Sequence, residues 1–317
     1  MVSMAQLVRP ALVFALIADA WLIALISSAE TGDAGRTAAM DAYPTWALLL
    51  LAAGLASGVY VFGMALNDVF DIRRDRAFAP ERPIASGQLR QNIAVAIGIT
   101  ALLLAIACAV PLGPASVLIC LVCAAGVLFY DAAGKWLPAV GPINLGLVRA
   151  GLMFAVNPAL SYGWPVALVL THVVFTSAAI HRLQRKRPRL HGRALWGLIA
   201  GWAFWLLALI SWTVIQEPAL DNAAPRPWIG PILAAAAFLL FARWHIGRAR
   251  SQRRAGEALM VYGTLWVIAY DTFWLAGTGL WWRAGIVAAL LPVAVGVRWL
   301  LDHARVMGEG EAFPRWR

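Results

Sequence analysis

The sequence predicts an all-α membrane protein, a single bundle of nine or ten helices that cross the bilayer. Hydrophobic residues make up 62% of the 317 residues, and charged residues only 13%. A soluble domain carries about 25% charged residues. Uncharged runs close to the ~20 residues that a membrane helix needs recur through the whole chain. Because lipid offers the backbone no hydrogen-bond partners, such runs are expected to be helical.

The apolar segments follow one another along the chain, and Pro, Gly or charged residues separate them. They fall at about residues 8–29, 44–70, 91–110, 114–130, 139–161, 164–181, 194–216, 228–246, 257–276 and 281–301. The first segment is longer than the roughly 7–15 apolar residues of a signal peptide, so it is read as the first membrane helix. The count is nine if one of the last segments is re-entrant or merged with its neighbour. The whole chain, 1–317, is therefore expected to form one transmembrane domain.

Positive charge predicts the side of the membrane on which each loop lies. With the N-terminus inside, the cytoplasmic loops are 71–90, 131–138, 182–193 and 247–256. The first and third of these are rich in arginine, whereas the outward loops carry few basic residues, which is the asymmetry expected of membrane proteins. The net charge of +10 is thus explained by anchoring in the bacterial inner (plasma) membrane. A nucleic-acid-binding role is excluded, because the sequence predicts no soluble basic domain.

Three aspartates interrupt the apolar pattern where the second predicted helix reaches the cytoplasm, in the stretch NDVFDIRRD, 67–75. On a helix, Asp68, Asp71 and Asp75 lie on one face, because they are three and four positions apart. Carboxylates so close repel each other. Mg²⁺ relieves this repulsion by binding one or two of them together with phosphate oxygens. The alternative is an ordinary helix end, in which the aspartates pair with the arginines of the same stretch.

The loop that follows reads PERPIASG, 80–87, a proline-braced segment with one arginine. Together the two stretches resemble the first signature of the UbiA family of intramembrane prenyltransferases. Further matches are Arg9 and Pro10 ahead of the first helix, and the stretch YDAAGK, 130–135, after the fourth. The resemblance covers most of the chain. It implies a helical bundle with a lateral opening to lipid and a polar cap on the cytoplasmic side, where the active site would lie.

The resemblance also implies roles for individual residues. Asp68, Asp71 and Asp75 would be catalytic and would hold Mg²⁺ on the diphosphate of a prenyl donor, with Asp75 nearest the solvent. Metal ions and fixed cations supply the stabilisation that the diphosphate needs as the allylic C–O bond ionises. Tyr130 would be a further catalytic residue that shelters the allylic cation. The residues implied to bind the donor are Asn67, Arg82, Lys135 and Arg9.

Charged residues also occur inside the predicted membrane helices. Arg149, in the fifth, is expected to face the polar cavity and bind substrate, because a charge that faces lipid is costly. Asp19 in the first helix and Asp271 in the ninth are similar cases. For these two aspartates, a structural partner and a catalytic role both stay open.

The second aspartate-rich motif that the UbiA family normally carries after the sixth helix is missing. Residues 180–193 read IHRLQRKRPRLHGR, without a carboxylate. One interpretation is anchoring by the positive-inside rule. The other is an anion site: if the sixth helix continues, Arg182, Arg185 and Lys186 share a face, and the two arginines bind the diphosphate in place of a second metal cluster. The altered loop is similar to that of a divergent UbiA branch such as the EboC-like proteins.

These features predict a Mg²⁺-dependent intramembrane prenyltransferase that moves a polyprenyl group from a prenyl diphosphate to an aromatic or other lipophilic acceptor. The alternative is a non-catalytic UbiA-like protein that binds or moves a prenyl lipid or a hydrophobic metabolite. Retention of the three aspartates favours the enzyme, and loss of the second motif favours the binder. The expected partners are the prenyl diphosphate donor, a lipophilic acceptor and the lipid bilayer.

Overall fold

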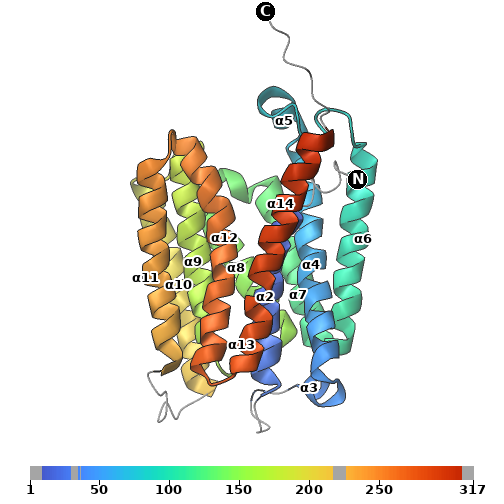
Figure 1. Ribbon diagram of the computed structural model, residues 1–317, viewed down its shortest axis with the longest axis vertical. Helices are drawn as coiled ribbons and strands as arrows, with labels where there is room; N and C mark the ends of the chain where they lie inside the picture. Colours follow the sequence, from blue (N-terminus) through green and yellow to red (C-terminus); the bar gives the residue numbers. More distant parts are fainter. Residues whose placement is uncertain (1–8, 30–34, 36, 217–225, 309–317) are drawn as a thin grey trace, which may run out of the picture.

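The computed structural model describes residues 9–29, 35, 37–216 and 226–308, which form a bundle of helices (Figure 1). These residues contain no strand, which confirms the predicted all-α class. The elements are η1 (Pro10–Leu12), α2 (Val13–Ser27), α3 (Ala38–Ala42), α4 (Thr45–Phe70), α5 (Ile72–Phe78), α6 (Gln91–Ala109), η2 (Val110–Leu112), α7 (Pro114–Ala132), η3 (Gly134–Trp136), α8 (Val140–Val156), α9 (Trp164–Leu183), α10 (Arg193–Gln216), α11 (Arg226–Arg248), α12 (Gln252–Gly277), α13 (Trp281–Ala288) and α14 (Leu290–Gly308).

The number of membrane helices agrees with the prediction of nine or ten. In the described part of the chain, nine helical spans are long and apolar enough to cross a bilayer, and the shorter helix Val140–Val156 is also apolar. The last span, Trp281–Leu301, is divided at Ala289 into α13 and α14. The chain is therefore an integral membrane protein.

Helix α8 ends earlier than the predicted range, 139–161. Asn157 leaves the helix with φ −140° and ψ 96°, because Pro158 follows it and the residue before a proline avoids helical geometry. The side-chain amide of Asn157 donates to Ser27 Oγ at 2.7 Å and to the carbonyl oxygen of Gly35 at 2.8 Å. These bonds tie the end of α8 to the end of α2.

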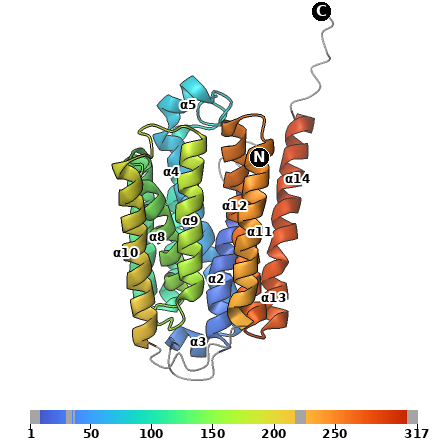
Figure 2. The ribbon, with the colours of Figure 1, turned by 90° about the vertical axis from the view of Figure 1, so that its left-hand side faces the viewer.

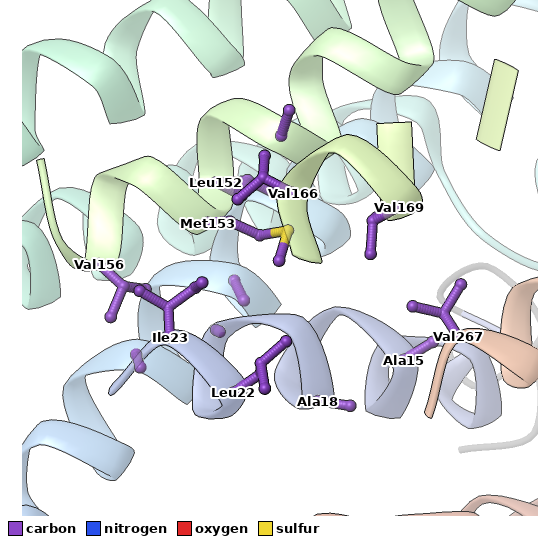
Figure 3. Close-up of a cluster of buried hydrophobic side chains, with 14 of the residues drawn as sticks. Ala15, Ala18, Leu22, Ile23, Leu152, Met153, Val156, Val166, Val169 and Val267 are labelled. Atoms are coloured by element: carbon purple, nitrogen blue, oxygen red, sulfur yellow. The ribbon is translucent and has the colours of Figure 1, made fainter. Parts of the chain in front are cut away.

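Helix α2 lies inside the bundle, where it packs against α4, α8, α12 and α14 (Figure 2). Figure 3 shows a buried cluster in which α2 packs against α8, α9 and α12. Its labelled side chains are Ala15, Ala18, Leu22, Ile23, Leu152, Met153, Val156, Val166, Val169 and Val267. Lipid is as apolar as these side chains, so close van der Waals packing rather than removal from water stabilises such contacts.

Helices α4 and α6 approach each other through small residues. A Cβ atom added at Gly58 would lie 2.5 Å from the carbonyl oxygen of Ala101 and 2.8 Å from the Cβ of Ala105. Only a glycine allows this spacing, so the backbones of α4 and α6 come into direct contact.

The charged loops lie together at one end of the bundle. Helix α5 lies there, at the top of Figure 1, and α4, α7 and α9 all run toward it. The loops between α7 and α8 and between α9 and α10 also lie at this end. This end is called the polar end below, and it holds the loops predicted to be cytoplasmic.

Candidate active site

The three aspartates of the motif lie together at the polar end. Helix α4 ends at Phe70, and Asp71 forms its junction with α5. Backbone hydrogen bonds continue across the junction, since Asp71 N–H donates to the carbonyl of Asn67 at 2.9 Å and Asp75 N–H donates to that of Asp71 at 2.8 Å. Asp68, Asp71 and Asp75 are 5%, 8% and 6% exposed. The expectation that Asp75 lies nearest the solvent is wrong, because its carboxylate turns inward to a cation.

Arg82 is the cation that faces two of these carboxylates. Its Nη1 atom lies 2.8 Å from Asp75 Oδ2 and 3.5 Å from Asp68 Oδ1. The loop that carries Arg82 is anchored by Ile84 and Leu89, whose buried side chains pack with residues of α4 and α6. The prolines and apolar residues of PERPIASG thus hold one guanidinium over the aspartates.

Lys135 reaches the remaining aspartate from the other side of the site. Its Nζ atom lies 2.7 Å from Asp71 Oδ1, and both side chains are 11% exposed. Lys135 belongs to η3, which follows α7, and its ammonium lies 6.0 Å from the ring centroid of Trp136. The structure therefore brings Arg82 and Lys135 to the motif from two separate segments.

The aspartates do not have the partners expected at an ordinary helix end, which was the alternative that the sequence allowed. Among the described residues, the salt bridges of these carboxylates are with Arg82 and Lys135, not with the arginines of NDVFDIRRD. Arg74, for example, lies 5.6 Å above the ring centroid of Trp136. Lys135 lies 64 positions from Asp71 in the sequence, so this pair is not one that an ordinary helix end would form.

Three residues of α4 and α7 complete the wall of the site. The Asn67 amide donates to Asp68 Oδ1 at 3.4 Å. Tyr130 is half-buried, and the charges of Asp131 and Asp71 act on it. Asp131 was not among the predicted site residues, although it is 3% exposed and lies in the electrostatic range of Lys135, Asp71 and Asp68. Its spacing of four residues from Lys135 in YDAAGK was the signal that could have identified it.

Two further cations lie within electrostatic range of the carboxylates. Arg9 has a left-handed backbone, φ 45°, and its carbonyl accepts a hydrogen bond from the Tyr60 hydroxyl at 3.2 Å. The positive charge of Arg9 acts on both Asp68 and Lys186. Lys186 is half-buried, and burial, with Arg74 next, lowers the pKa of its ammonium. The sequence placed Lys186 on a helical face but did not identify it as a site residue.

The loop after α9 does not form the predicted helical face. Helix α9 ends at Leu183, and Arg185 adopts φ 50°. Arg185 N–H donates to the carbonyl of Arg182 and Lys186 N–H to that of His181, both at 3.1 Å. This pair of bonds is the Schellman motif that ends helices, here with arginine where glycine is usual.

The side chains of this loop consequently separate. Arg182 and Arg185 are exposed, and Arg185 Nε donates to Gln252 Oε1 at 3.2 Å. The turn instead brings Lys186 within electrostatic range of Asp71. The helix continuation that would align the three cations is therefore wrong, while a role of the two arginines in binding substrate stays a prediction.

Arg149 has its partners inside the bundle. Its Nε atom pairs with Asp19 Oδ2, and its Nη2 atom donates to the carbonyl of Ala15 at 2.9 Å. Asp271 is fully buried and interacts electrostatically with both Asp19 and Arg149. The structure thus joins Asp19 and Asp271, whose roles the sequence left open, to Arg149 through helices α2, α8 and α12. The contact of Arg149 with substrate stays a prediction.

The carboxylates suit a Mg²⁺ ion that arrives with a diphosphate better than one bound by protein alone. In the part of the chain that is described, no three His, Cys, Asp or Glu side chains form a ready metal cage. Mg²⁺, however, usually takes one or two carboxylates and completes its shell with water and phosphate oxygens. Asp131 Oδ2 is buried without a hydrogen-bond partner in the described structure, so it is available as an oxygen ligand for a cation.

Solved structures share this arrangement of helices. A digeranylgeranylglyceryl phosphate synthase structure matches with a TM-score of 0.54 and 16% identity, over 87% of this chain and 97% of that one. A UbiA homologue from Archaeoglobus fulgidus matches with a TM-score of 0.53 and 15% identity, over 86% and 99% of the two chains. The same homologue has been solved bound to DMAPP and Mg²⁺, with a TM-score of 0.46 to this chain, 15% identity and coverage of 93% and 99%.

Curated sequences with local similarity carry the same synthase name. Digeranylgeranylglyceryl phosphate synthases from Saccharolobus solfataricus and Methanosarcina barkeri are 34% identical over 82 residues and 31% identical over 111. These stretches are 26% and 35% of this chain, and they span only 29% and 37% of the synthases. No family model matches the chain. The fold of the bundle is that of the UbiA homologues, and the resemblance to the UbiA family predicted from the aspartate motif is confirmed.

Proposed function

We propose that the chain is an intramembrane prenyltransferase that uses Mg²⁺ and a prenyl diphosphate donor. The observation that carries the proposal is the cluster of three buried aspartates faced by Arg82 and Lys135 at the polar end of the bundle. The shared fold and the local similarity to two digeranylgeranylglyceryl phosphate synthases support it. The acceptor is a lipophilic molecule that reaches the site through the membrane.

The arrangement of cations suits the leaving group of the reaction. Arg82 and Lys135 are held beside the carboxylates, where their N–H groups meet the oxygens of an incoming diphosphate. A guanidinium donates two parallel hydrogen bonds to such oxygens, and an ammonium acts as a point charge. Lys186 and Arg9 add positive charge to the same region.

The carboxylates Asp68, Asp71 and Asp75 would hold the metal ion, with Asp131 beside them. Bound Mg²⁺ supplies stabilisation of the negative charge that develops on the leaving diphosphate. In the reaction, the allylic C–O bond breaks, and its electron pair leaves with the diphosphate. The allylic carbon then forms a bond to the acceptor, which loses a proton. Tyr130 borders the site and is placed to shelter the allylic cation with its ring.

The complete cluster favours the enzyme over a non-catalytic binder of lipids. Burying several carboxylates is costly unless cations pair with them. A binder of neutral lipid has no use for such a cluster, whereas cleavage of a diphosphate requires charge in this place. We also propose that the polar end faces the cytoplasm, because the arginine-rich loops lie at this end.

The test is binding of a non-hydrolysable prenyl diphosphate analogue to the purified protein with and without Mg²⁺. We expect Mg²⁺-dependent binding that Asp68→Asn and Asp71→Asn both abolish. Glu257→Gln is the matched control, since Glu257 is an exposed carboxylate that pairs with Arg253 in the same helix. Magnesium-independent binding that is the same in both aspartate variants as in the parent would exclude the metal site.

A further inference from the structure

The loop after α9 encloses a hollow beside the site of the proposed reaction. It has a volume of about 320 Å³, at the small end of the roughly 300–1,000 Å³ typical of ligand sites. Its lining contains three arginines, one lysine and two histidines but no carboxylate. The lining residues are His181, Arg182, Arg185, Lys186, Arg189, Leu190 and His191.

Defined contacts of the loop give the hollow its shape. The Schellman turn reverses the chain directly after α9 and requires Arg185 to adopt a left-handed backbone. The ring of His181, buried in the last turn of α9, then bonds to the carbonyl of Pro188, with its Nε2 atom 2.8 Å from the oxygen. Leu190 is buried behind the loop. An arginine held at positive φ strains the backbone, because its Cβ comes close to a carbonyl oxygen.

In the described part of the chain, the cations of the hollow are not paired with carboxylates. Among the residues that the structure describes, Arg182, Lys186 and Arg189 have no salt bridge, and Arg185 donates to a neutral amide. The carbonyl groups at the end of α9 attract some of this positive charge. Anchoring in a membrane, however, requires cations that extend outward to the headgroups, whereas Lys186 is half-buried at the wall of the hollow.

Lys186 connects the hollow to the active site. It lines the hollow, and its charge also acts on Asp71, Lys135 and Arg9. The aspartates themselves are not part of the lining. An anion in the hollow would therefore lie next to the donor site, held by guanidinium groups and without a metal ion.

We propose that this basic hollow is a phosphate subsite distinct from the donor site, and that it binds a phosphomonoester. Guanidinium groups match phosphate oxygens in geometry and charge, and the hollow lies at the polar end, where lipid headgroups are found. Combined with the proposed function, on which this step rests, it makes a phosphorylated lipid the class of acceptor that fits. The same chemistry could be supplied by a soluble phosphomonoester, which the experiment distinguishes.

The experiment measures binding of glycerol 3-phosphate to the full chain in mild detergent, without Mg²⁺, by calorimetry. The paired Arg182→Gln and Arg189→Gln variant removes two cations of the lining, and we expect it to bind at least tenfold more weakly than the parent. Arg187→Gln is the matched control, because Arg187 lies in the same loop and is exposed but does not line the hollow. It should bind within twofold of the parent.

Two further measurements separate this proposal from the proposed function. Asp71→Asn should lose the prenyl diphosphate analogue and keep glycerol 3-phosphate, and a saturating analogue should leave glycerol 3-phosphate bound. The affinity for glycerol 3-phosphate is then compared in nanodiscs that contain phosphatidic acid and in nanodiscs of phosphatidylcholine alone. If a lipid is the natural ligand, phosphatidic acid should compete and lower this affinity. If the natural ligand is soluble, the affinity should be the same in both. Equal losses in the Arg187 control and the paired variant, no binding in the parent, or complete displacement by the donor analogue would each overturn the second subsite.

Discussion

The pair formed by Lys135 and Asp71 offers a sharp test of how the site is built. Their side chains approach to 2.7 Å and are each 11% exposed. Removing one partner of a buried pair costs about 3–5 kcal/mol, because the other charge is left without compensation. The pair lies at the polar end rather than at the centre of the bundle, so we expect Lys135→Met to lower the free energy of unfolding by about 3 kcal/mol, the lower limit of that range.

A second substitution separates stability from function. In the variant that combines Lys135→Met with Asp71→Asn, no unpaired carboxylate remains, and we expect it to recover about 2 kcal/mol of the loss. Binding of the donor analogue should not recover, because both a cation and a carboxylate of the donor site are gone. The exposed pair Arg253 and Glu257, 76% and 51% exposed, is the control, and Arg253→Met should change stability by less than about 1 kcal/mol.

The assay is equilibrium unfolding of the four proteins in mixed micelles of mild detergent and sodium dodecyl sulfate, followed by helical circular dichroism. The reasoning is refuted if Lys135→Met unfolds like the parent. It is also refuted if the combined variant is no more stable than Lys135→Met alone, since the unpaired Asp71 would then not be the cause of the loss.

Other predictions concern the backbone and the charge of the site. Arg185→Gly should be more stable than Arg185→Gln by about 1 kcal/mol, measured by the same unfolding assay, because glycine adopts the left-handed turn without strain. Gly58→Leu should cost about 3 kcal/mol or more, since its side chain meets the carbonyl of Ala101, whereas Gly285→Leu, with open space at its Cβ, should cost little. Binding of the donor analogue should weaken as the pH rises through the lowered pKa of Lys186, because the neutral amine no longer attracts the diphosphate, and a pH titration of Lys186→Arg should lack this step. The charged groups that act on Lys186 are Arg74, Asp71, Lys135 and Arg9.

The sequence predicted those features that depend on residues close to one another in the chain. The apolar runs predicted the membrane helices because each run is as long as a bilayer is thick. The spacing of the aspartates predicted a shared face, and all three are indeed buried where α4 meets α5. In both cases the period of the helix connects residues that are close in the chain.

Features that depend on distant segments were not predictable in the same way. The pair formed by Arg149 and Asp19 joins residues 130 positions apart, and no local pattern indicates such a partner. The end of α9 was missed because a Schellman turn is usually signalled by glycine, whereas here the position is occupied by Arg185. Consequently the sequence did not show that the chain turns Lys186 toward the aspartates.

The central claim is that the aspartate cluster cleaves a prenyl diphosphate. The most direct measurement supplies a prenyl diphosphate and Mg²⁺ to the protein in nanodiscs made from its native membrane lipids, and follows both released pyrophosphate and new prenylated lipid by mass spectrometry. We expect the two products to appear in equal amounts in the parent and to be absent in Asp68→Asn. Bound but unconsumed prenyl diphosphate in the parent would contradict the account and would identify the chain as a non-catalytic binder.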